Sequence, residues 1–435
     1  MFPSDSRRAV PRLAPDRDPE SIDNSGYRSS IRNSHGGTRR LSGESESRGR
    51  SKFIVYCAGV HWDDLPGTDR RLTQALAKQV TVLWVDPPKS IARSRLDAGR
   101  PSTYRRLERV APGIVRLTVI VPPYPERVGI RPFTDLIMAR AIKTTVARAP
   151  GTAAAMVVTC YEPRFNALPG VKHAYYATDD FTAGADLMKV SARYLRRAEN
   201  YQISHADVLF AISPEVSDRW AGGSGQVIML PNGCEPDHYR NVDSAPLPGD
   251  VHLSRPIAGV VGQLSARIDI SILEAIADEG ISLLLVGPRS RDFERERLAA
   301  LLKKRNVQWV GEKSFAELPS YLRVIDAGLT PYANSAFNRA SFPLKTLEYL
   351  AAGRASISTS LPAVTRMNTE LISVASSPSE FVAKTRLALA EDRTPGLIER
   401  RRHLASMNSW DERARVMLGT LGLKSNPRGS EGHGT

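Results

Sequence analysis

Side chains in the segment Phe337–Thr359 have the types and the spacing needed to bind an anion next to a pair of hydroxyl groups. Pro343 suits the first turn of a helix, whose N–H groups near Leu344 form a site for an anion such as a diphosphate. Lys345 adds a positive charge, and Glu348 lies on the same helix face, where its two oxygens can accept hydrogen bonds from adjacent sugar hydroxyls. An ordinary capped helix with a surface ion pair explains the same pattern, and the residues alone leave both interpretations open.

A second candidate for anion binding lies in the segment Val260–Asp269. The predicted strand there ends at Gly262, and a glycine at this place lets the backbone approach a ligand closely. Arg267 follows in the loop, where a fixed cation would stabilise a departing diphosphate. One glycine turn with one arginine is a weak signal, which Lys345 and Glu348 strengthen.

Polar residues after two predicted strands of the first half are further candidates. Asp179 and Asp180 end the segment His173–Asp180, and open α/β sheets bind ligands at such strand ends. Helix capping or loop solvation explains this acidic pair about as well. Gly67, in the loop His61–Arg71, could open the backbone towards a ligand, although an exposed loop explains it too.

Alternating apolar and helical segments must position these residues. Short apolar runs that end in glycine or polar residues are typical of buried parallel strands. In the first half these runs are Phe53–Gly59, Val80–Pro88, Gly113–Pro123, Ala153–Cys160, His173–Asp180, Ala206–Ser213 and Gln226–Gly233. After a polar linker they are Pro256–Gly262, Ile281–Gly287, Asn306–Gly311, Ala327–Tyr332 and Ala355–Ser360. Helical stretches separate several of them, so the alternation predicts an α/β fold of two Rossmann-like domains, each with a doubly wound parallel sheet.

Changes in composition give the expected domain boundaries. Residues 1–50 are rich in Ser, Arg, Gly and Asp and hold few apolar side chains, which predicts a disordered tail. We expect the N-terminal Rossmann-like domain at 51–240, the C-terminal one at 251–395, and C-terminal helices at 396–423. Residues 424–435 have a composition like that of the first tail and are predicted to be disordered as well.

The 435-residue chain is basic, with 60 Lys and Arg against 46 Asp and Glu, and the excess is uneven. The stretch Lys89–Arg148 holds 13 basic and 4 acidic residues, which indicates an anionic partner. A helix predicted there has Phe133, Leu136 and Ile137 on one side and Arg140 and Lys143 elsewhere, a pattern suited to an anionic membrane surface. A solvated helix face explains this pattern nearly as well. Nucleic-acid binding is not expected, because the sequence lacks helix-turn-helix, RRM and zinc-binding spacings.

The three cysteines, Cys57, Cys160 and Cys234, lie far apart and lack a C-x-x-C spacing. This pattern argues against disulfides and zinc sites and favours the reducing cytoplasm. No apolar run approaches the roughly 20 residues that span a bilayer, and the N-terminal residues lack the apolar core of a secretory signal. We therefore expect a cytoplasmic protein that the basic stretch could bring to the inner face of the plasma membrane.

The segment Ser341–Gly353 (SFPLKTLEYLAAG) resembles the donor-site signature of GT-B glycosyltransferases, especially the retaining glycosyltransferase group 1, or family 4. Glu348 matches the second glutamate of the family's E-x7-E motif, and the resemblance implies that it binds the ribose of the nucleotide. The first glutamate, which contacts the donor sugar in the family, is replaced by Ala340. This departure leaves the identity of the sugar open.

The stretch NRASFPLK is similar to a variant signature, N-x-x-x-x-P-x-K-x-x-E-Y-L-A-x-G, of teichuronic-acid and other surface-polysaccharide transferases. The similarity implies that Asn338, Arg339 and Ser341 take over contacts to the sugar or to phosphate. Leu230–Tyr239 resembles the N-G-V-D segment that closes the N-terminal domain, and Ser409–Trp410 resembles the family's C-terminal end. The resemblance implies two domains that face each other across a cleft, with C-terminal helices that cross back to the N-terminal domain.

The resemblance also implies a role for each candidate residue. A nucleoside-diphosphate sugar would bind the C-terminal domain and an acceptor the N-terminal domain. The donor-binding residues would be Gly262, Asn338, Arg339, Ser341, Leu344 and Glu348. The catalytic residues would be Asp180, Arg267 and Lys345, since the two cations stabilise the departing diphosphate and Asp180 faces the acceptor or the sugar. Gly67 would mark a loop that contacts the acceptor or the diphosphate.

The expected donors are UDP-, GDP- or dTDP-linked sugars, which are substrates, and no cofactor is expected. No metal is expected, because glycosyltransferases of the other common fold, GT-A, hold a divalent ion with a D-x-D motif, and here that motif occurs at Asp16–Asp18 in the predicted disordered tail. The expected acceptor is a glycan or a lipid-linked molecule of cell-envelope, exopolysaccharide or glycolipid synthesis, glycosylated with retention. Two alternatives stay open: a UDP-sugar epimerase with a GT-B-like fold, which needs no acceptor, and a catalytically silent GT-B-like binding protein, suggested by Ala340.

Overall fold

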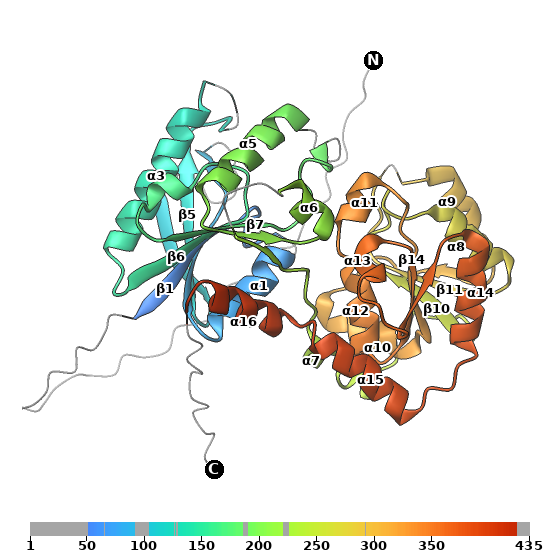
Figure 1. Cartoon of the computed structure of the whole chain (residues 1–435). Helices are drawn as coiled ribbons and strands as arrows, with labels where there is room; N and C mark the ends of the chain where they lie inside the picture. Colours follow the sequence, from blue (N-terminus) through green and yellow to red (C-terminus); the bar gives the residue numbers. More distant parts are fainter. Residues whose placement is uncertain are drawn as a thin grey trace, which may run out of the picture. The chain divides into compact units, whose positions relative to one another are not determined.

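The computed structural model describes residues 51–64, 66–91, 104–125, 127, 129–185, 190–220, 226–291 and 293–423. The tails predicted to be disordered, 1–50 and 424–435, lie outside the described residues, and so does Asp16–Asp18. Two sheets with helices on both faces form the predicted α/β fold (Figure 1). Within the described ranges, no helix is both long enough and apolar enough to cross a membrane.

The N-terminal sheet is built from strands that lie between residues 52 and 229. They are β1 (Lys52–Cys57), β2 (Thr81–Val85), β3 (Lys89–Ser90), β4 (Arg105–Ala111), β5 (Ile114–Val121), β6 (Thr152–Val158), β7 (Lys172–Ala177), β8 (Val208–Ala211) and β9 (Gln226–Met229). Their order is β3-β5-β2-β1-β6-β7-β8-β9, with β4 paired antiparallel to β5. The inner strands are buried almost throughout, which explains why they appear in the sequence as continuous apolar runs.

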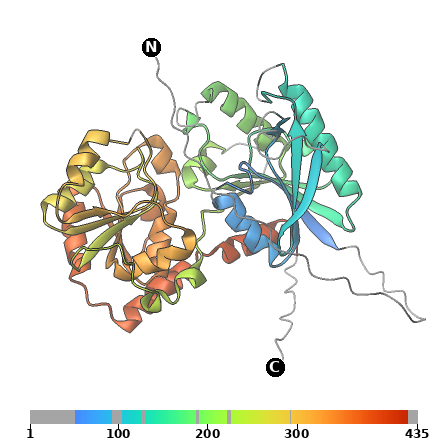
Figure 2. The ribbon, with the colours of Figure 1, turned by 180° about the vertical axis from the view of Figure 1, so that it is seen from behind.

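Helices cover both faces of the N-terminal sheet. They are α1 (Thr68–Ala77), α3 (Arg131–Ala147), α5 (Ala192–His205), α6 (Pro214–Arg219) and α16 (Trp410–Thr420). The short helix α7 (Pro236–Tyr239) packs instead against helices of the C-terminal sheet. In Figure 1, α3 and α5 lie over one face of the sheet, and α1 and α16 lie over the other. The view from behind in Figure 2 again shows the blue α1 beside the red α16. Trp410 and Met417 of α16 are buried in the same hydrophobic core as Leu72 and Leu76 of α1, so the last helix completes the core of the first sheet.

The C-terminal sheet is entirely parallel. Its strands are β10 (Ile257–Val261), β11 (Ser282–Val286), β12 (Val307–Trp309), β13 (Ala327–Thr330), β14 (Ala355–Thr359) and β15 (Ile372–Ala375). Their order, β12-β11-β10-β13-β14-β15, is the 3-2-1-4-5-6 order of a Rossmann fold. The order reverses between β10 and β13, and ligands of such sheets bind at the carboxyl ends of the strands at this switch point.

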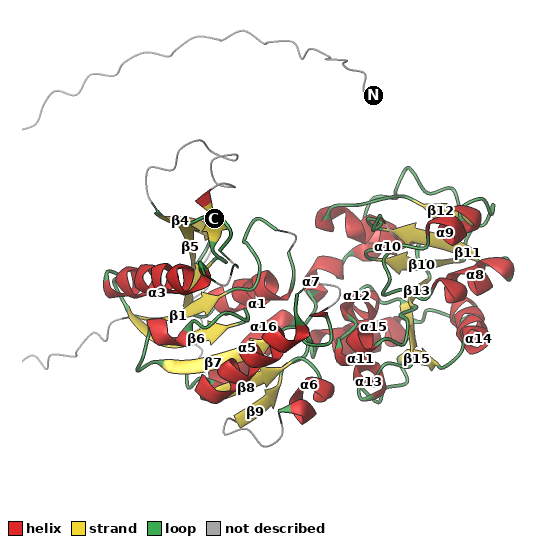
Figure 3. Ribbon diagram, turned by 90° about the horizontal axis from the view of Figure 1, so that it is seen from above, coloured by secondary structure: helices red, strands yellow, loops and turns green. Residues whose placement is uncertain are grey.

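Helices flank the C-terminal sheet on two sides, as the red helices and yellow strands of Figure 3 show. One set is α8 (Ile270–Asp278), α9 (Arg295–Leu301) and α14 (Pro378–Leu389). The other set is α10 (Leu318–Val324), α12 (Leu344–Ala351) and α15 (Pro395–Ser406). Two short helices, α11 (Ala336–Ala340) and α13 (Pro362–Thr365), lie in loops after the strands. The prediction of two Rossmann-like units in one α/β chain is confirmed.

The N-terminal sheet departs from a wholly parallel sheet at β4. This strand was not predicted, because its sequence RRLERVA holds three arginines and lacks a buried apolar run. It lies at the outer side of β5, where Leu107 and Arg109 are exposed. An edge strand with charged side chains avoids pairing with another chain, and this explains its unusual composition.

Candidate functional site

Helix α12 is fixed against the switch point of the C-terminal sheet by Tyr349. The hydroxyl of this buried residue accepts a hydrogen bond from the Val261 N–H at 2.9 Å and donates one to the Leu329 carbonyl at 3.2 Å. A Cβ atom added at Gly328 would lie 2.1 Å from the Tyr349 ring, so only glycine leaves room for the helix. The start of α12 is therefore held beside the ends of β10 and β13.

Gly262, Lys345 and Glu348 come together at this place. Gly262 follows β10 with a φ of 147°, a conformation that favours glycine, and a Cβ atom added there would lie 3.8 Å from Cε of Lys345. Lys345 Nζ lies 2.7 Å from Glu348 Oε2, and only 8% of the Glu348 side chain is exposed. Leu344 is the first residue of α12, whose first-turn N–H groups have no partners within the helix. A cation, a buried carboxylate and helix N–H groups thus meet at one strand end.

The segment Leu230–Tyr239 packs beside Glu348, a contact that the sequence did not predict. Tyr239 is buried, and its pKa is raised well above the usual value by burial and then by the charge of Glu348. The nearby charge of Arg71 acts in the opposite direction on the same hydroxyl. The segment that resembles a family marker therefore connects α12 with the first turns of α1.

Gly67 precedes α1 and is exposed. A Cβ atom added there would meet nothing within 4 Å, so the structure gives no steric reason for glycine at this position. Arg71, one turn further, pairs with Glu235, and its guanidinium lies 3.8 Å from the ring centroid of Phe315. The contact of Gly67 with acceptor or diphosphate stays a prediction.

Arg267 is oriented by Asn338. Its Nε–H donates to Asn338 Oδ1 at 2.9 Å, while Asn338 Nδ2 donates to the carbonyls of Arg267 and Ala333 at 2.9 Å and 2.8 Å. The guanidinium also lies 4.9 Å and 5.0 Å from the ring centroids of Tyr332 and Phe337. Asn338 is fully buried and its side chain contacts protein groups, so the structure places it behind Arg267. Its direct contact with a sugar stays a prediction.

The other residues of the signature differ in exposure. Ser341 is 2% exposed, and its hydroxyl donates to the Phe337 carbonyl at 2.8 Å. Arg339 is exposed, and its Nη1 donates to Asn334 Oδ1 at 3.0 Å. Ala340, at the position of the missing glutamate, is buried at the end of α11. Donor contacts from Ser341 and Arg339 stay predictions.

The two neighbouring acids after β7 have different surroundings. Asp180 is 4% exposed, and its carboxylate accepts hydrogen bonds from Arg219 Nη1 at 2.7 Å and from the Ala183 N–H at 2.9 Å. Asp179 is half-buried, and its pKa is raised to about 6 by burial, against the lowering effect of the positive charge of Arg267. Asp180 thus stabilises a turn, whereas Asp179 is the acid whose pKa is lowered by the positive charge of Arg267. The sequence could not separate the two, because Arg219 is distant in the chain.

Asp69 is a buried acid of the same region that the sequence interpretation did not select. It accepts hydrogen bonds from the Gly59 N–H at 2.9 Å and from the hydroxyls of Tyr56 and Thr159 at 3.0 Å each. Burial raises its pKa, and these three donors oppose that effect. Asp69 therefore holds the loop after β1 against the end of β6.

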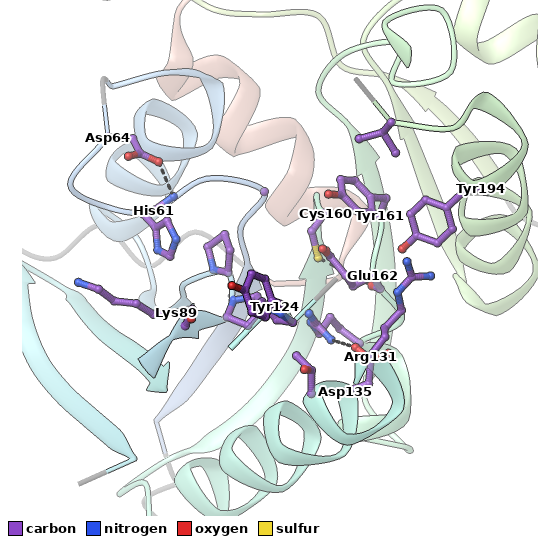
Figure 4. A pocket seen from close by; sticks show the side chains of 18 of the residues that line it. His61, Asp64, Lys89, Tyr124, Arg131, Asp135, Cys160, Tyr161, Glu162 and Tyr194 are labelled. Carbon is purple, nitrogen blue, oxygen red and sulfur yellow. Dashed lines mark hydrogen bonds and ion pairs between the residues drawn. The ribbon is translucent and has the colours of Figure 1, made fainter. Parts of the chain in front are cut away.

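A cavity of about 1100 Å³ opens at the carboxyl ends of β1, β2 and β6 (Figure 4). Three tyrosines, Tyr124, Tyr161 and Tyr194, line it together with Arg131 and Glu162. The Arg131 guanidinium lies 4.1 Å from the ring centroid of Tyr194, whose ring meets that of Tyr161 edge-on at 5.8 Å. Aromatic rings beside charged and polar groups suit a hydroxyl-rich ligand such as a sugar.

Internal ion pairs stiffen the wall of this cavity. Arg164 Nη1 lies 2.7 Å from Asp135 Oδ1, and Arg116 Nε lies 2.6 Å from the buried Asp86. Burial opposes the ionisation of Asp86, but the nearby His61 ring, the hydrogen bond from the Trp84 ring and the charge of Arg116 lower its pKa to about 2. The loop His61–Arg71, which the sequence indicated as a contact to the acceptor or the diphosphate, contributes His61, Asp63 and Asp64 to the lining. Gly67 and the other selected site residues are not among the lining residues, which come from segments scattered along the chain.

Among the residues that the structure describes, no group of three or more His, Cys, Asp or Glu side chains is arranged to hold a metal ion. The absence of a metal and of a cofactor stays a prediction.

Comparison with known proteins finds a similarity in the C-terminal half. Residues 256–391 match the family described as Glycosyl transferases group 1. The putative teichuronic acid biosynthesis glycosyltransferase TuaH of Bacillus subtilis (strain 168) is 27% identical over 251 residues. This similarity covers 55% of the present chain and 62%, less than two thirds, of that relative's length.

Solved structures resemble the chain over both sheets. Sucrose-phosphate synthase (tll1590) from Thermosynechococcus elongatus has a TM-score of 0.63 and 17% identity, and the similarity covers 86% of this chain and 98% of that one. A structure described as trehalose-6-phosphate from E. coli bound with UDP-2-fluoro glucose has a TM-score of 0.62 and 13% identity, with 85% and 99% covered. At these identities the similarity shows the fold. The chain is therefore similar to the glycosyl transferases of group 1 over residues 256–391, and it has the GT-B fold.

Proposed function

We propose that the chain transfers a sugar from a nucleoside-diphosphate sugar, bound at the C-terminal sheet, to a hydroxyl group of an acceptor in the cavity of the N-terminal sheet. The observation that carries this proposal is the meeting of Gly262, Lys345 and Glu348 at the switch point. Two negative phosphates would find a cation and helix N–H groups there. The buried Glu348 carboxylate would accept hydrogen bonds from the ribose hydroxyls.

The barrier to the transfer would be lowered mainly by electrostatic stabilisation of the leaving group. When the bond between the anomeric carbon and the diphosphate oxygen breaks, its electron pair moves onto the diphosphate. Lys345 and Arg267 would stabilise that charge, and Asn338 would keep Arg267 in place. Arg339 and Ser341 would complete the donor site. Neither a metal nor a cofactor is part of the proposed reaction, and the anomeric configuration would be retained.

The acceptor would bind in the cavity lined by Tyr124, Tyr161 and Tyr194. The rings would stack on sugar faces, while Arg131 and Glu162 would bind hydroxyl groups. Asp179 replaces Asp180 as our candidate acid at the acceptor. Asp180 is paired with Arg219, whereas the charge of Arg267 acts on Asp179. An ionised Asp179 would attract the proton of the acceptor hydroxyl as the new bond forms.

The names of the similar proteins support a narrower setting. The E. coli structure is described as bound with UDP-2-fluoro glucose, which favours a UDP-linked sugar as the donor. The relative from Bacillus subtilis is described as a teichuronic acid biosynthesis glycosyltransferase. We therefore place the reaction in the synthesis of a cell-envelope polysaccharide or glycolipid, in the cytoplasm, where nucleotide sugars are made.

A screen of UDP-, GDP- and dTDP-linked sugars by thermal unfolding tests this proposal. The sugars linked to one of these nucleotides should raise the unfolding temperature of the chain by about 3 °C or more at saturating concentration, because a bound ligand stabilises the folded state. Nuclear magnetic resonance of the same mixtures would then follow the sugar. Epimerisation without an acceptor would instead identify an epimerase, and no saturable binding of any nucleotide would identify a catalytically silent protein.

A further inference from the structure

The hydroxyl of Tyr239 is a buried polar group that lacks a partner. Tyr239 is fully buried, and its hydroxyl forms no hydrogen bond of normal length and angle with another residue that the structure describes. A buried hydroxyl without a hydrogen bond lowers the stability of a folded chain. Such a group therefore needs an explanation, and one explanation is a bond that forms in a second state of the protein.

Aromatic neighbours keep the ring of Tyr239 in place. The rings of His238 and Phe315 meet it nearly edge-on, with ring centroids 4.8 Å and 6.2 Å away. His238 Nε2 lies 2.8 Å from the carbonyl oxygen of Phe315, which fixes α7 at the surface of the C-terminal domain. In Figures 1 and 3, α7 lies beside α12, and the two helices are in contact. The ring is thus held against the helix that carries Glu348.

Glu348 is the acceptor beside this hydroxyl. After burial, the charge of Glu348 is the largest influence on the pKa of Tyr239, and both raise it. Tyr239 therefore keeps its proton at neutral pH and can donate it in a hydrogen bond. In the structure, however, Glu348 Oε2 is bonded to Lys345 Nζ at 2.7 Å. Two donors face one buried carboxylate, and Lys345 is the one bonded to it.

A bound diphosphate would compete with Glu348 for Lys345. The Lys345 side chain is long and 25% exposed, so its ammonium group can turn towards phosphate oxygens. Glu348 would then lose its cation while 8% of its side chain is exposed. A buried carboxylate needs hydrogen-bond donors to stay ionised. The ribose hydroxyls would supply some of them, and the unpaired Tyr239 hydroxyl would supply another.

We propose that Tyr239 is a positioning residue for Glu348, and that its hydroxyl donates to the Glu348 carboxylate when Lys345 turns to the diphosphate of the donor. The exchange of partners keeps the carboxylate ionised and fixes the direction in which it faces the ribose. No proton is transferred, because the tyrosine is a donor throughout. The ligand in this step rests on the proposed function, whereas the unpaired hydroxyl does not.

Isothermal titration of UDP and of 2′,3′-dideoxy-UDP onto Tyr239→Phe tests this role. The variant should bind UDP about tenfold more weakly than the unaltered chain, because a hydrogen bond to a charged group is lost. It should bind the dideoxy compound within about twofold of the unaltered chain, since that compound lacks the hydroxyls that Glu348 accepts. UDP affinity within twofold of the unaltered chain, or equal losses for both compounds, would overturn the proposal.

Tyr176→Phe is the matched control. Tyr176 is also fully buried, but its hydroxyl donates to the Leu230 carbonyl at 3.0 Å. Without nucleotide, Tyr176→Phe should lower the unfolding temperature by about 2–4 °C, and its UDP affinity should change less than twofold. Tyr239→Phe should not lower the unfolding temperature, because it removes a hydroxyl without a partner. An equal decrease in both variants would show that the Tyr239 hydroxyl is already bonded, and would overturn the exchange.

Lys345→Met tests the exchange without any ligand. This variant removes the present partner of Glu348, so the Tyr239 hydroxyl should then bond to the carboxylate. Adding Tyr239→Phe to Lys345→Met should lower the unfolding temperature by about 2–4 °C, although it does not do so in the unaltered chain. The same effect of Tyr239→Phe in both backgrounds would contradict the idea that Lys345 and Tyr239 are alternative partners.

The failure of this proposal can be told from the failure of the proposed function. An unaltered chain that binds no nucleotide would contradict the proposed function, while the unfolding temperatures of the Lys345→Met pair would still support or overturn Tyr239 as the second partner of Glu348. Normal UDP binding by Tyr239→Phe would overturn the role of Tyr239 alone and leave the proposed function standing.

Discussion

The two sheets form their candidate sites by different means. At the C-terminal sheet, the candidate ligand residues come from two short segments, Val260–Arg267 and Asn338–Glu348, and tight packing of Tyr349 holds these segments together. At the N-terminal sheet, the cavity is assembled from loops, strand ends and the first turns of helices, spread between Gly59 and Arg197. A contiguous motif can be recognised in a sequence, whereas a cavity made of scattered side chains becomes visible only when the loops are brought together.

The cations of the two sites differ in the partners that they already have. Lys345 and Arg267 face a strand end and a helix start, where an anion can replace or join their present partners. In the cavity wall, Arg164 and Arg116 are already paired with Asp135 and Asp86. The first arrangement suits a diphosphate and the second a largely neutral, hydroxyl-bearing ligand.

The largest effect on kcat is expected for Arg267→Gln. This variant tests whether the cation that stabilises the leaving group lies at the C-terminal sheet. Loss of a fixed cation beside the leaving group should lower kcat by about 10²–10³-fold. Steady-state kinetics with the donor found in the screen would measure it, and the KM for the acceptor should change little.

Arg297→Gln is the matched control, because Arg297 pairs with Glu274 on the helices that cover the sheet. It should keep kcat within about twofold, as expected for an exposed ion pair. Equal losses for Arg267→Gln and Arg297→Gln would show that neither cation has a special place in the reaction.

A smaller effect is expected for Asp179→Asn at the N-terminal sheet. Because the pKa of Asp179 is about 6 in the folded chain and 3.8 is its ordinary value, the folded state binds the proton more tightly between these values. Stability is therefore lost as the pH rises from 4 to 6, and above pH 6 the ionised group destabilises the fold. Two pH units correspond to about 3 kcal/mol, which partial exposure reduces to about 1–2 kcal/mol.

Asp179→Asn should accordingly raise the unfolding temperature by about 2–5 °C at pH 7.5 and have little effect at pH 4. Thermal unfolding followed by circular dichroism at both values measures this difference. Asp180→Asn is the comparison variant and should lower stability at pH 7.5, since it removes the partner of Arg219. A gain for Asp179→Asn that is the same at both pH values would contradict the assigned pKa.

The sequence predicted the architecture well because buried parallel strands are continuous apolar runs. It missed β4 because an exposed edge strand with arginines has no such run. It brought Lys345 and Glu348 together because the helix period places them on one face, and of the acidic pair it selected Asp180, where we now propose Asp179. That choice depends on Arg219, which lies far along the chain and comes close only in the folded sheet.

The cavity was not predicted for a related reason. Tyr124 and Tyr161 lie in separate loops and Tyr194 lies in the first turn of α5, and nothing in their local sequence relates one to another. The role of Asn338 behind Arg267 was also hidden, because it depends on a loop turning back onto α11. Contacts between distant segments are what the sequence pattern does not contain.

Isothermal titration of the nucleotide found in the screen, onto Glu348→Ala and Tyr194→Ala, tests the division between the two sites most directly. Glu348→Ala should weaken nucleotide binding about tenfold or more, because it removes a charged hydrogen-bond acceptor from the ribose. Tyr194→Ala should leave that affinity within about twofold, because its ring belongs to the acceptor cavity. Unchanged affinity in a folded Glu348→Ala variant, with weakened binding in Tyr194→Ala, would contradict the assignment of the donor to the C-terminal sheet.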